Sequence, residues 1–202
     1  MSTAIVASIV LLWITVIALV LAVLGLSRQV GVLLERIAPA GALMTGKGLR
    51  PGEAAPELNL ASLGGDPVHV GGARTDQRSM LVFFLSPTCP MCDAVVPAVK
   101  SLAGSERGWL DVVLASDGDD ADHEGYVRRK KLQELPYVVS RELGLRFRVG
   151  QLPHAVLIDE SGKVAAAGLI NTREHLDSLL EAKQRGVASL QQYIELQSQR
   201  KT

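Results

Sequence analysis

The fold of this chain is decided by one stretch of sequence, MLVFFLSPTCPMC at residues 80–92. Its first part, residues 80–85, is an uninterrupted apolar run, which is typical of a strand buried on both faces of a sheet. Ser86 and Pro87 end that run. The residues after Cys92, rich in alanine and valine up to Gly104, have helical character. The stretch therefore predicts a buried strand, a short loop and a helix that begins at the cysteines.

Cys89 and Cys92 are the only cysteines, and so short a loop would constrain the unfolded chain very little. Their value is more chemical than structural. The first turn of a helix has backbone N–H groups without partners and partial positive charge, which stabilise a thiolate. We expect Cys89 to act as nucleophile and Cys92, one turn later, to resolve a mixed disulfide. Pro90 suits the first turn, and Met91 is expected to be exposed and to shape partner choice.

Two other interpretations of the cysteine pair stay open. A Cys-x-x-Cys is often half of a zinc site, but zinc requires four ligands. The histidines that could complete such a site are scattered and singly placed: His69, His123, His154 and His175. The two cysteines could also be buried structural residues. The transition from strand to helix disfavours both, and no metal site is predicted.

A second candidate feature lies late in the chain, in Gln151-Leu152-Pro153-His154. Pro153 stands at the entrance to a predicted strand. If its peptide bond is cis, Leu152 turns toward the cysteines and offers its backbone to an extended client. The alternative is an ordinary proline at the start of a strand. His154 could tune the thiolate electrostatically or could point away from it.

The remaining pattern predicts an α/β fold, a central mixed sheet with flanking helices. A hairpin is expected around a Gly-rich turn, and the later strands and helices alternate. The expected elements are strands at 58–60, 68–70, 111–115, 155–158 and 163–167, and helices at 123–135 and from a capping-box-like Asn171 to Lys183.

The N-terminus predicts a different element. Residues 5–26 contain no charge, and about 20 apolar residues suffice to cross a bilayer. A cleaved signal would have a shorter apolar region and a preceding basic residue. We therefore expect an uncleaved transmembrane helix in contact with the lipid bilayer. The predicted organisation is an anchor (1–27), a linker (28–50), the α/β domain (51–185) and a C-terminal helix or tail (186–202).

Charge gives weaker information. The chain has 21 basic and 21 acidic residues, and this balance argues against nucleic acid as a partner. Arg28 and Arg36 follow the predicted span, which slightly favours a cytoplasmic domain. Disulfide chemistry favours the opposite side, because disulfides persist in oxidising compartments such as the periplasm. We give the chemistry more weight and expect a single-pass protein of the cytoplasmic membrane with a periplasmic domain.

The order of these features resembles the thioredoxin superfamily from about Pro51 to Lys183. The resemblance rests on the buried strand, the Cys-x-x-Cys, a proline at position 97 within the following helix, and Pro153. It implies a nucleophilic Cys89, a resolving Cys92 and a cis Pro153. The opening at residues 52–56 resembles the membrane-anchored periplasmic branch called TlpA-like.

Two differences from thioredoxins proper concern the motif. A buried acid on the strand before the cysteines is replaced here by Phe83 and Phe84, and a tryptophan before the first cysteine is replaced by Thr88. Both differences argue against an efficient general reductase.

A closer resemblance combines the N-terminal span with FLSPTCPMC at 84–92 and GLINTREHL at 168–176. These features resemble the MauD family of methylamine utilization proteins across nearly the whole chain. The resemblance implies an accessory protein that forms or rearranges disulfides in the periplasmic, cysteine-rich small (beta) subunit of methylamine dehydrogenase. We expect no cofactor beyond the redox-active Cys89–Cys92 disulfide, and an unidentified membrane or periplasmic redox partner.

Three other functions remain open at this point. A reductase for cytochrome c maturation would use the same motif, because direction depends on reduction potential. A copper-binding chaperone would need a histidine beside the thiolates, and only His154 qualifies. A non-catalytic binding module would use the fold without its chemistry.

Overall fold

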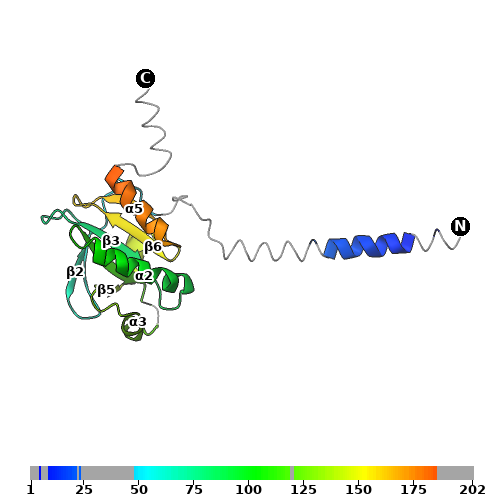
Figure 1. The fold of residues 1–202 in the computed structure, drawn as a ribbon, viewed down its shortest axis with the longest axis horizontal. Helices are drawn as coiled ribbons and strands as arrows, with labels where there is room; N and C mark the ends of the chain where they lie inside the picture. Colours follow the sequence, from blue (N-terminus) through cyan, green and yellow to red (C-terminus); the bar gives the residue numbers. More distant parts are fainter. Residues whose placement is uncertain (1–4, 6–8, 22, 24–47, 119–120, 186–202) are drawn as a thin grey trace, which may run out of the picture. The chain divides into compact units, whose positions relative to one another are not determined.

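The computed structural model describes residues 5, 9–21, 23, 48–118 and 121–185 (Figure 1). The chain divides into two units, Met1–Gly41 and Ala42–Thr202. In the first unit, residues 9–21 are helical and their large apolar side chains are exposed. Within the described residues, no helix combines the length and hydropathy that a membrane span requires. Residues 6–8, 22 and 24–26 of the predicted span, most of the predicted linker and the whole predicted tail fall outside the described residues.

The second unit has the predicted thioredoxin-like α/β fold. Its strands and helices follow in the order β1 (Leu58–Ala61), β2 (Pro67–Val70), β3 (Ser79–Phe84), α2 (Pro90–Ser105), β4 (Leu110–Ser116), α3 (His123–Lys130), β5 (Tyr137–Val139), α4 (Arg141–Arg146), β6 (His154–Ile158), β7 (Val164–Leu169) and α5 (Arg173–Arg185). The main sheet has the strand order β5-β4-β3-β6-β7. Because β4 and β5 run parallel to β3 while β6 runs antiparallel to it, the sheet is mixed.

Strand β3 is the centre of the sheet, and all six of its residues are buried. Successive side chains point to opposite faces. Leu81 and Phe83 pack with α2 and α5 on one face, whereas Val82 and Phe84 pack with α4 and the β1–β2 hairpin on the other. The continuous apolar run therefore contributes to two cores at once, one on each face of the sheet.

The predicted hairpin is present. Strands β1 and β2 pair antiparallel, with Leu58 opposite Val70 and Ala61 opposite Pro67. Their buried residues join the core on the α4 face. Leu49 belongs to the same core and is 4% exposed, so packing begins slightly before residue 51.

The predicted helix at 123–135 is too long. Helix α3 ends at Lys130, because Lys131 adopts the left-handed conformation (φ 55°) and closes the helix with its own N–H. A turn follows, and the chain then forms β5, a three-residue strand that the sequence analysis missed. A strand this short has too few residues for a period to be recognised. Helix α5 likewise begins at Arg173 rather than at Asn171.

Helix α4 depends on one hydrogen bond at its start. Ser140 is the N-cap residue, and its Oγ accepts a hydrogen bond from the N–H of Leu143 at 3.2 Å. We expect Ser140→Ala to lower the free energy of unfolding by about 1 kcal/mol, because a backbone donor of the first turn loses its partner. Urea titration of the purified chain measures this change. Ser140→Asn keeps an N-cap acceptor, so an equal loss in both variants would contradict this interpretation.

Candidate active site

Helix α2 begins at the carboxyl end of β3 and positions the two cysteines there. Cys89 is the N-cap residue, and its Sγ accepts a hydrogen bond from the N–H of Cys92 at 3.1 Å. Pro90 occupies the first turn, where its missing N–H removes no helical hydrogen bond. The backbone of the first turn therefore supports negative charge on Cys89 once the disulfide is reduced.

Cys89 and Cys92 form a disulfide, with their Cα atoms 5.3 Å apart. The two sulfur-bearing side chains differ in exposure. Cys92 is fully buried in the core between the sheet and α2, whereas Cys89 is only partly buried at the edge of that core. Solvent can therefore reach Cys89 but not Cys92. This asymmetry suits an exposed nucleophile and a shielded resolving thiol.

The loop before Cys89 is held by local hydrogen bonds. The Ser86 and Thr88 hydroxyls lie 2.9 Å apart, and the Cys89 N–H donates to the Ser86 carbonyl at 3.1 Å. Beyond the cysteines, Met91 is 47% exposed, as the sequence predicted. The side chains around the accessible sulfur are thus small, polar or flexible.

The predicted late-proline segment lies at the same end of the sheet. The Leu152–Pro153 peptide bond is cis. Since β6 pairs antiparallel with β3 and places His154 opposite Phe84, the residues just before β6 lie beside the loop that leaves β3. The Pro153 carbonyl accepts a hydrogen bond from the N–H of Ile170 at 2.9 Å. Topology therefore brings Leu152 and Pro153 to the sheet end that carries the cysteines.

His154 does not face the cysteines. Its ring packs 6.4 Å from that of Phe84, on the face of the sheet covered by α4, whereas Cys92 packs on the opposite face. Burial lowers the pKa of His154 from 6.5 to about 4, so the ring is neutral near pH 7. The hypothesis that His154 tunes Cys89 is not supported by this geometry.

An acidic residue beside the motif was missed by the sequence analysis. Asp93 follows Cys92 in the first turn of α2, and its carboxylate pairs with the Lys130 ammonium at 3.0 Å. Burial opposes ionisation of Asp93, but the neighbouring Lys130 ammonium and Tyr126 hydroxyl outweigh it and lower the pKa of this carboxyl. The only signal in the sequence is an acid at a helix start, which is common at ordinary helices.

The described residues contain no group of three or more histidine, cysteine or acidic side chains that could hold a metal ion. His154 was the only histidine that the fold placed near the thiolates, and it faces the other side of the sheet. A copper site built on the two cysteines and His154 has no support in this arrangement.

A mixed sheet, a Cys-x-x-Cys disulfide at a helix start and an adjacent cis-proline define the class of thioredoxin-like proteins. The family model described as Redoxin matches residues 50–182. Among solved structures, the thioredoxin domain of a thiol-disulfide oxidoreductase from Bacteroides vulgatus superposes with a TM-score of 0.56 at 17% identity. The match covers 66% of this chain and 97% of that one.

Curated relatives identify the family more closely. A methylamine utilization protein MauD from Paracoccus denitrificans is 45% identical over 194 residues, covering 96% of each chain. One from Paracoccus versutus is 46% identical over 192 residues, covering 95% of each chain. The chain belongs to the MauD family of methylamine utilization proteins and, more broadly, to the Redoxin family.

Proposed function

We propose that the chain is a thiol-disulfide oxidoreductase that acts on a protein client during maturation of methylamine dehydrogenase. One observation carries the proposal: a partly exposed Cys89 joined to a fully buried Cys92 at the start of α2, beside the cis Leu152–Pro153 bond. Membership of the MauD family of methylamine utilization proteins supports the proposed link to methylamine dehydrogenase. The small, cysteine-rich subunit of the dehydrogenase is the proposed client.

The proposed exchange proceeds in two balanced steps. In the reduced protein, the Cys89 thiolate attacks a client disulfide, and one client sulfur leaves as a thiolate that takes a proton. Cys92 then attacks Cys89 Sγ, which releases the second client thiol and reforms the Cys89–Cys92 disulfide. Two electrons pass to the client. The reverse sequence oxidises a client dithiol. If instead another client cysteine attacks the first mixed disulfide, Cys89 is released and the client's disulfide pairing is rearranged.

The segment from Leu152 to Pro153 is proposed to align the client. Backbone groups just before β6 are available to an extended segment that approaches Cys89 from the edge of the site. Met91 and Pro90, both exposed, border the same approach and are proposed to contribute to client choice. None of Pro90, Met91, Leu152 and Pro153 carries a charge.

The chain enters the domain beside the first residue of β7. There the Gly52 N–H donates to the Val164 carbonyl at 2.8 Å. Val164 pairs with Ile158, which lies opposite Met80 near the amino end of β3, whereas Cys89 follows the carboxyl end. We propose that residues 5–26 anchor the chain in the cytoplasmic membrane, with the domain in the periplasm. The first described residues of the domain thus lie at the end of the sheet opposite the disulfide.

The test is a trapping experiment with Cys92→Ala in a bacterium whose own homologue is deleted, which grows on a second carbon source with methylamine added to induce the dehydrogenase. The resolving thiol is gone, so clients should accumulate on Cys89 as adducts that a reductant releases. We expect the small dehydrogenase subunit to be the main adduct, in the membrane fraction. The Cys89→Ala, Cys92→Ala double variant is the matched control and should trap nothing.

The other outcomes would reject parts of the proposal. Apocytochromes as the main adducts would indicate a cytochrome c maturation reductase. Many unrelated adducts would indicate a broad disulfide enzyme. If nothing is trapped while the dehydrogenase subunits are expressed, disulfide exchange with this client is wrong.

A further inference from the structure

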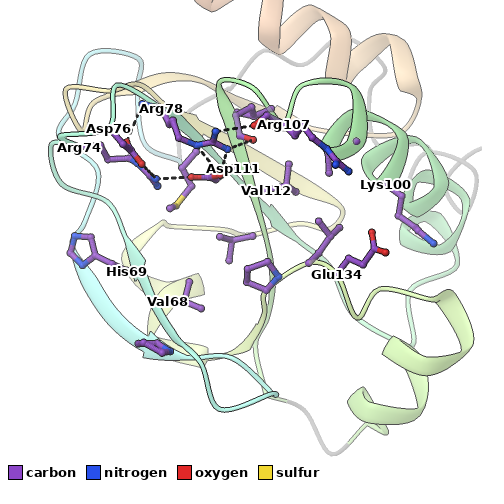
Figure 2. A pocket seen from close by; sticks show the side chains of 18 of the residues that line it. Val68, His69, Arg74, Asp76, Arg78, Lys100, Arg107, Asp111, Val112 and Glu134 are labelled. Atoms are coloured by element: carbon purple, nitrogen blue, oxygen red, sulfur yellow. Dashed lines mark hydrogen bonds and ion pairs between the residues drawn. The ribbon is translucent and has the colours of Figure 1, made fainter.

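A cavity lies at the end of the sheet opposite the disulfide. Its volume is about 710 Å³, within the range of small ligand or peptide sites. It is bounded by β2, the loop at 73–78, the C-terminal part of α2, the first half of β4 and the loop at 131–136 (Figure 2). The disulfide exchange does not involve this cavity, because Cys89 follows the carboxyl ends of the strands whose amino ends line it.

The cavity exposes an unpaired edge of β4. Strand β5 pairs with β4 only from Leu114 onward, where the Leu114 N–H donates to the Pro136 carbonyl at 2.8 Å. Pro136 has no N–H, and the Leu135 N–H donates to the Leu132 carbonyl at 3.0 Å. The pairing of β4 with the segment before β5 therefore ends at Pro136. Two residues earlier on β4, Val112 directs its N–H and C=O toward the same side. No strand of the described residues pairs with Val112 on this side, while the Leu110 carbonyl, two residues earlier on the same edge, accepts a hydrogen bond from the Arg78 guanidinium at 3.3 Å.

The walls of the cavity suit an added strand. Met80 and Val113 line it from the α4 face of the sheet, and Val68 of β2 closes that side. Ala103 and Gly104 of α2 border the other side, where a methyl group and a residue without a side chain leave space. An extended segment that pairs with Val112 would direct alternate side chains toward these two walls.

The charges around the cavity select the partner. Arg74 is paired with Asp76 and Asp111, both at 2.6 Å, and Arg78 is also paired with Asp111, so this group is neutral overall. The remaining charged lining residues are three cations against one acid: Lys100, Arg107, Lys131 and Glu134. Figure 2 shows Arg107 and Lys100 on the α2 side of the opening. The net excess of positive charge favours an acidic ligand.

We propose that this cavity is a docking groove for an extended acidic segment of a partner protein, which adds a strand to the free edge of β4 next to Val112. Main-chain hydrogen bonds supply the affinity in this mode of recognition, and the cations at the opening supply the preference for acidic sequences. The proposal is independent of the disulfide chemistry, because the groove and the cysteines lie at opposite ends of the sheet.

The test uses the full chain in nanodiscs and a fluorescein-labelled hexapeptide of alternating glutamate and valine. Binding is followed by fluorescence anisotropy, and protection of β4 by hydrogen–deuterium exchange. We expect saturable binding that protects β4, and an affinity reduced at least about tenfold in the Arg107→Glu, Lys131→Glu double variant. Arg141→Glu, an exposed charge reversal on α4, is the matched control and should leave the affinity unchanged. Disulfide exchange should be unchanged in all variants.

Two peptide controls distinguish strand addition from non-specific electrostatic binding. A lysine-valine hexapeptide should not bind, and N-methylation of alternate amides of the acidic peptide should abolish binding because it removes the donors to β4. Equal binding of the methylated peptide, or binding that protects the disulfide end instead of β4, would overturn the proposal. If deletion of residues 186–202 is required before the peptide binds, the occupant is the chain's own tail and the proposal is wrong.

Discussion

Replacement of Cys89 by serine is expected to lower the rate of thiol–disulfide exchange by at least about three orders of magnitude. A serine hydroxyl is not ionised near neutral pH, whereas a thiolate is the species that attacks and leaves in exchange. Cys92 cannot take over the first step, because its side chain is fully buried between β3 and α2. The measurement is reduction of a fluorescent mixed disulfide of glutathione by the prereduced chain.

Cys92→Ser is the matched variant. It removes the resolving thiol but leaves the accessible Cys89, so the first exchange with the probe should persist while turnover stops at the mixed disulfide. The reduced wild-type chain should likewise be alkylated by iodoacetamide at Cys89 before Cys92. If Cys89→Ser retains exchange and Cys92→Ser loses the first step, the roles assigned to the two cysteines must be reversed.

His154 should make the free energy of unfolding of the domain fall at acidic pH, because its ring is buried. The pKa of this ring is lowered from 6.5 to about 4 in the folded state because burial disfavours the charged form. The unfolded chain therefore binds a proton at higher pH than the native chain does. The contribution of neutral His154 to the free energy of unfolding is fully present above about pH 6.5 and is lost as the pH falls toward 4. The gap between the two pKa values corresponds to roughly 3 kcal/mol.

The variant His154→Leu tests this expectation. It replaces the imidazole by an apolar side chain beside Phe84, so most of the loss of unfolding free energy between pH 7 and 4.5 should disappear. Urea titrations followed by the fluorescence of Trp109 measure it at each pH. His69→Gln changes an exposed histidine and should keep the wild-type pH dependence. A pH profile unchanged in His154→Leu would show that other groups cause the acid sensitivity.

Features that depend on neighbouring residues were predictable. The apolar run at 80–85, the loop and the Cys-x-x-Cys define a strand and a helix start whatever else the chain does, because hydrophobic period and helix capping act over a few residues. The hairpin around residues 64–67 was equally local. The prediction of a cis Pro153 came from the resemblance to thioredoxins, because the residue type alone leaves both isomers open.

Features that depend on contacts between distant parts of the chain could not be predicted from the sequence. The side of the sheet that His154 faces is set by its register with Phe84, 70 positions away in the sequence. The Asp93–Lys130 pair needs α3 to pack beside α2. The three residues of β5 form a strand only because β4 offers them an edge.

The sequence by itself determined the fold class, the position of the cysteines at a helix start and the family to which the chain belongs. Only the tertiary structure decided which cysteine is accessible, where His154 points and which part of β4 stays unpaired. The physical reason is that period, capping and motif spacing are local properties of the chain. Burial, strand register and the pairing of charges arise only when distant segments pack against one another.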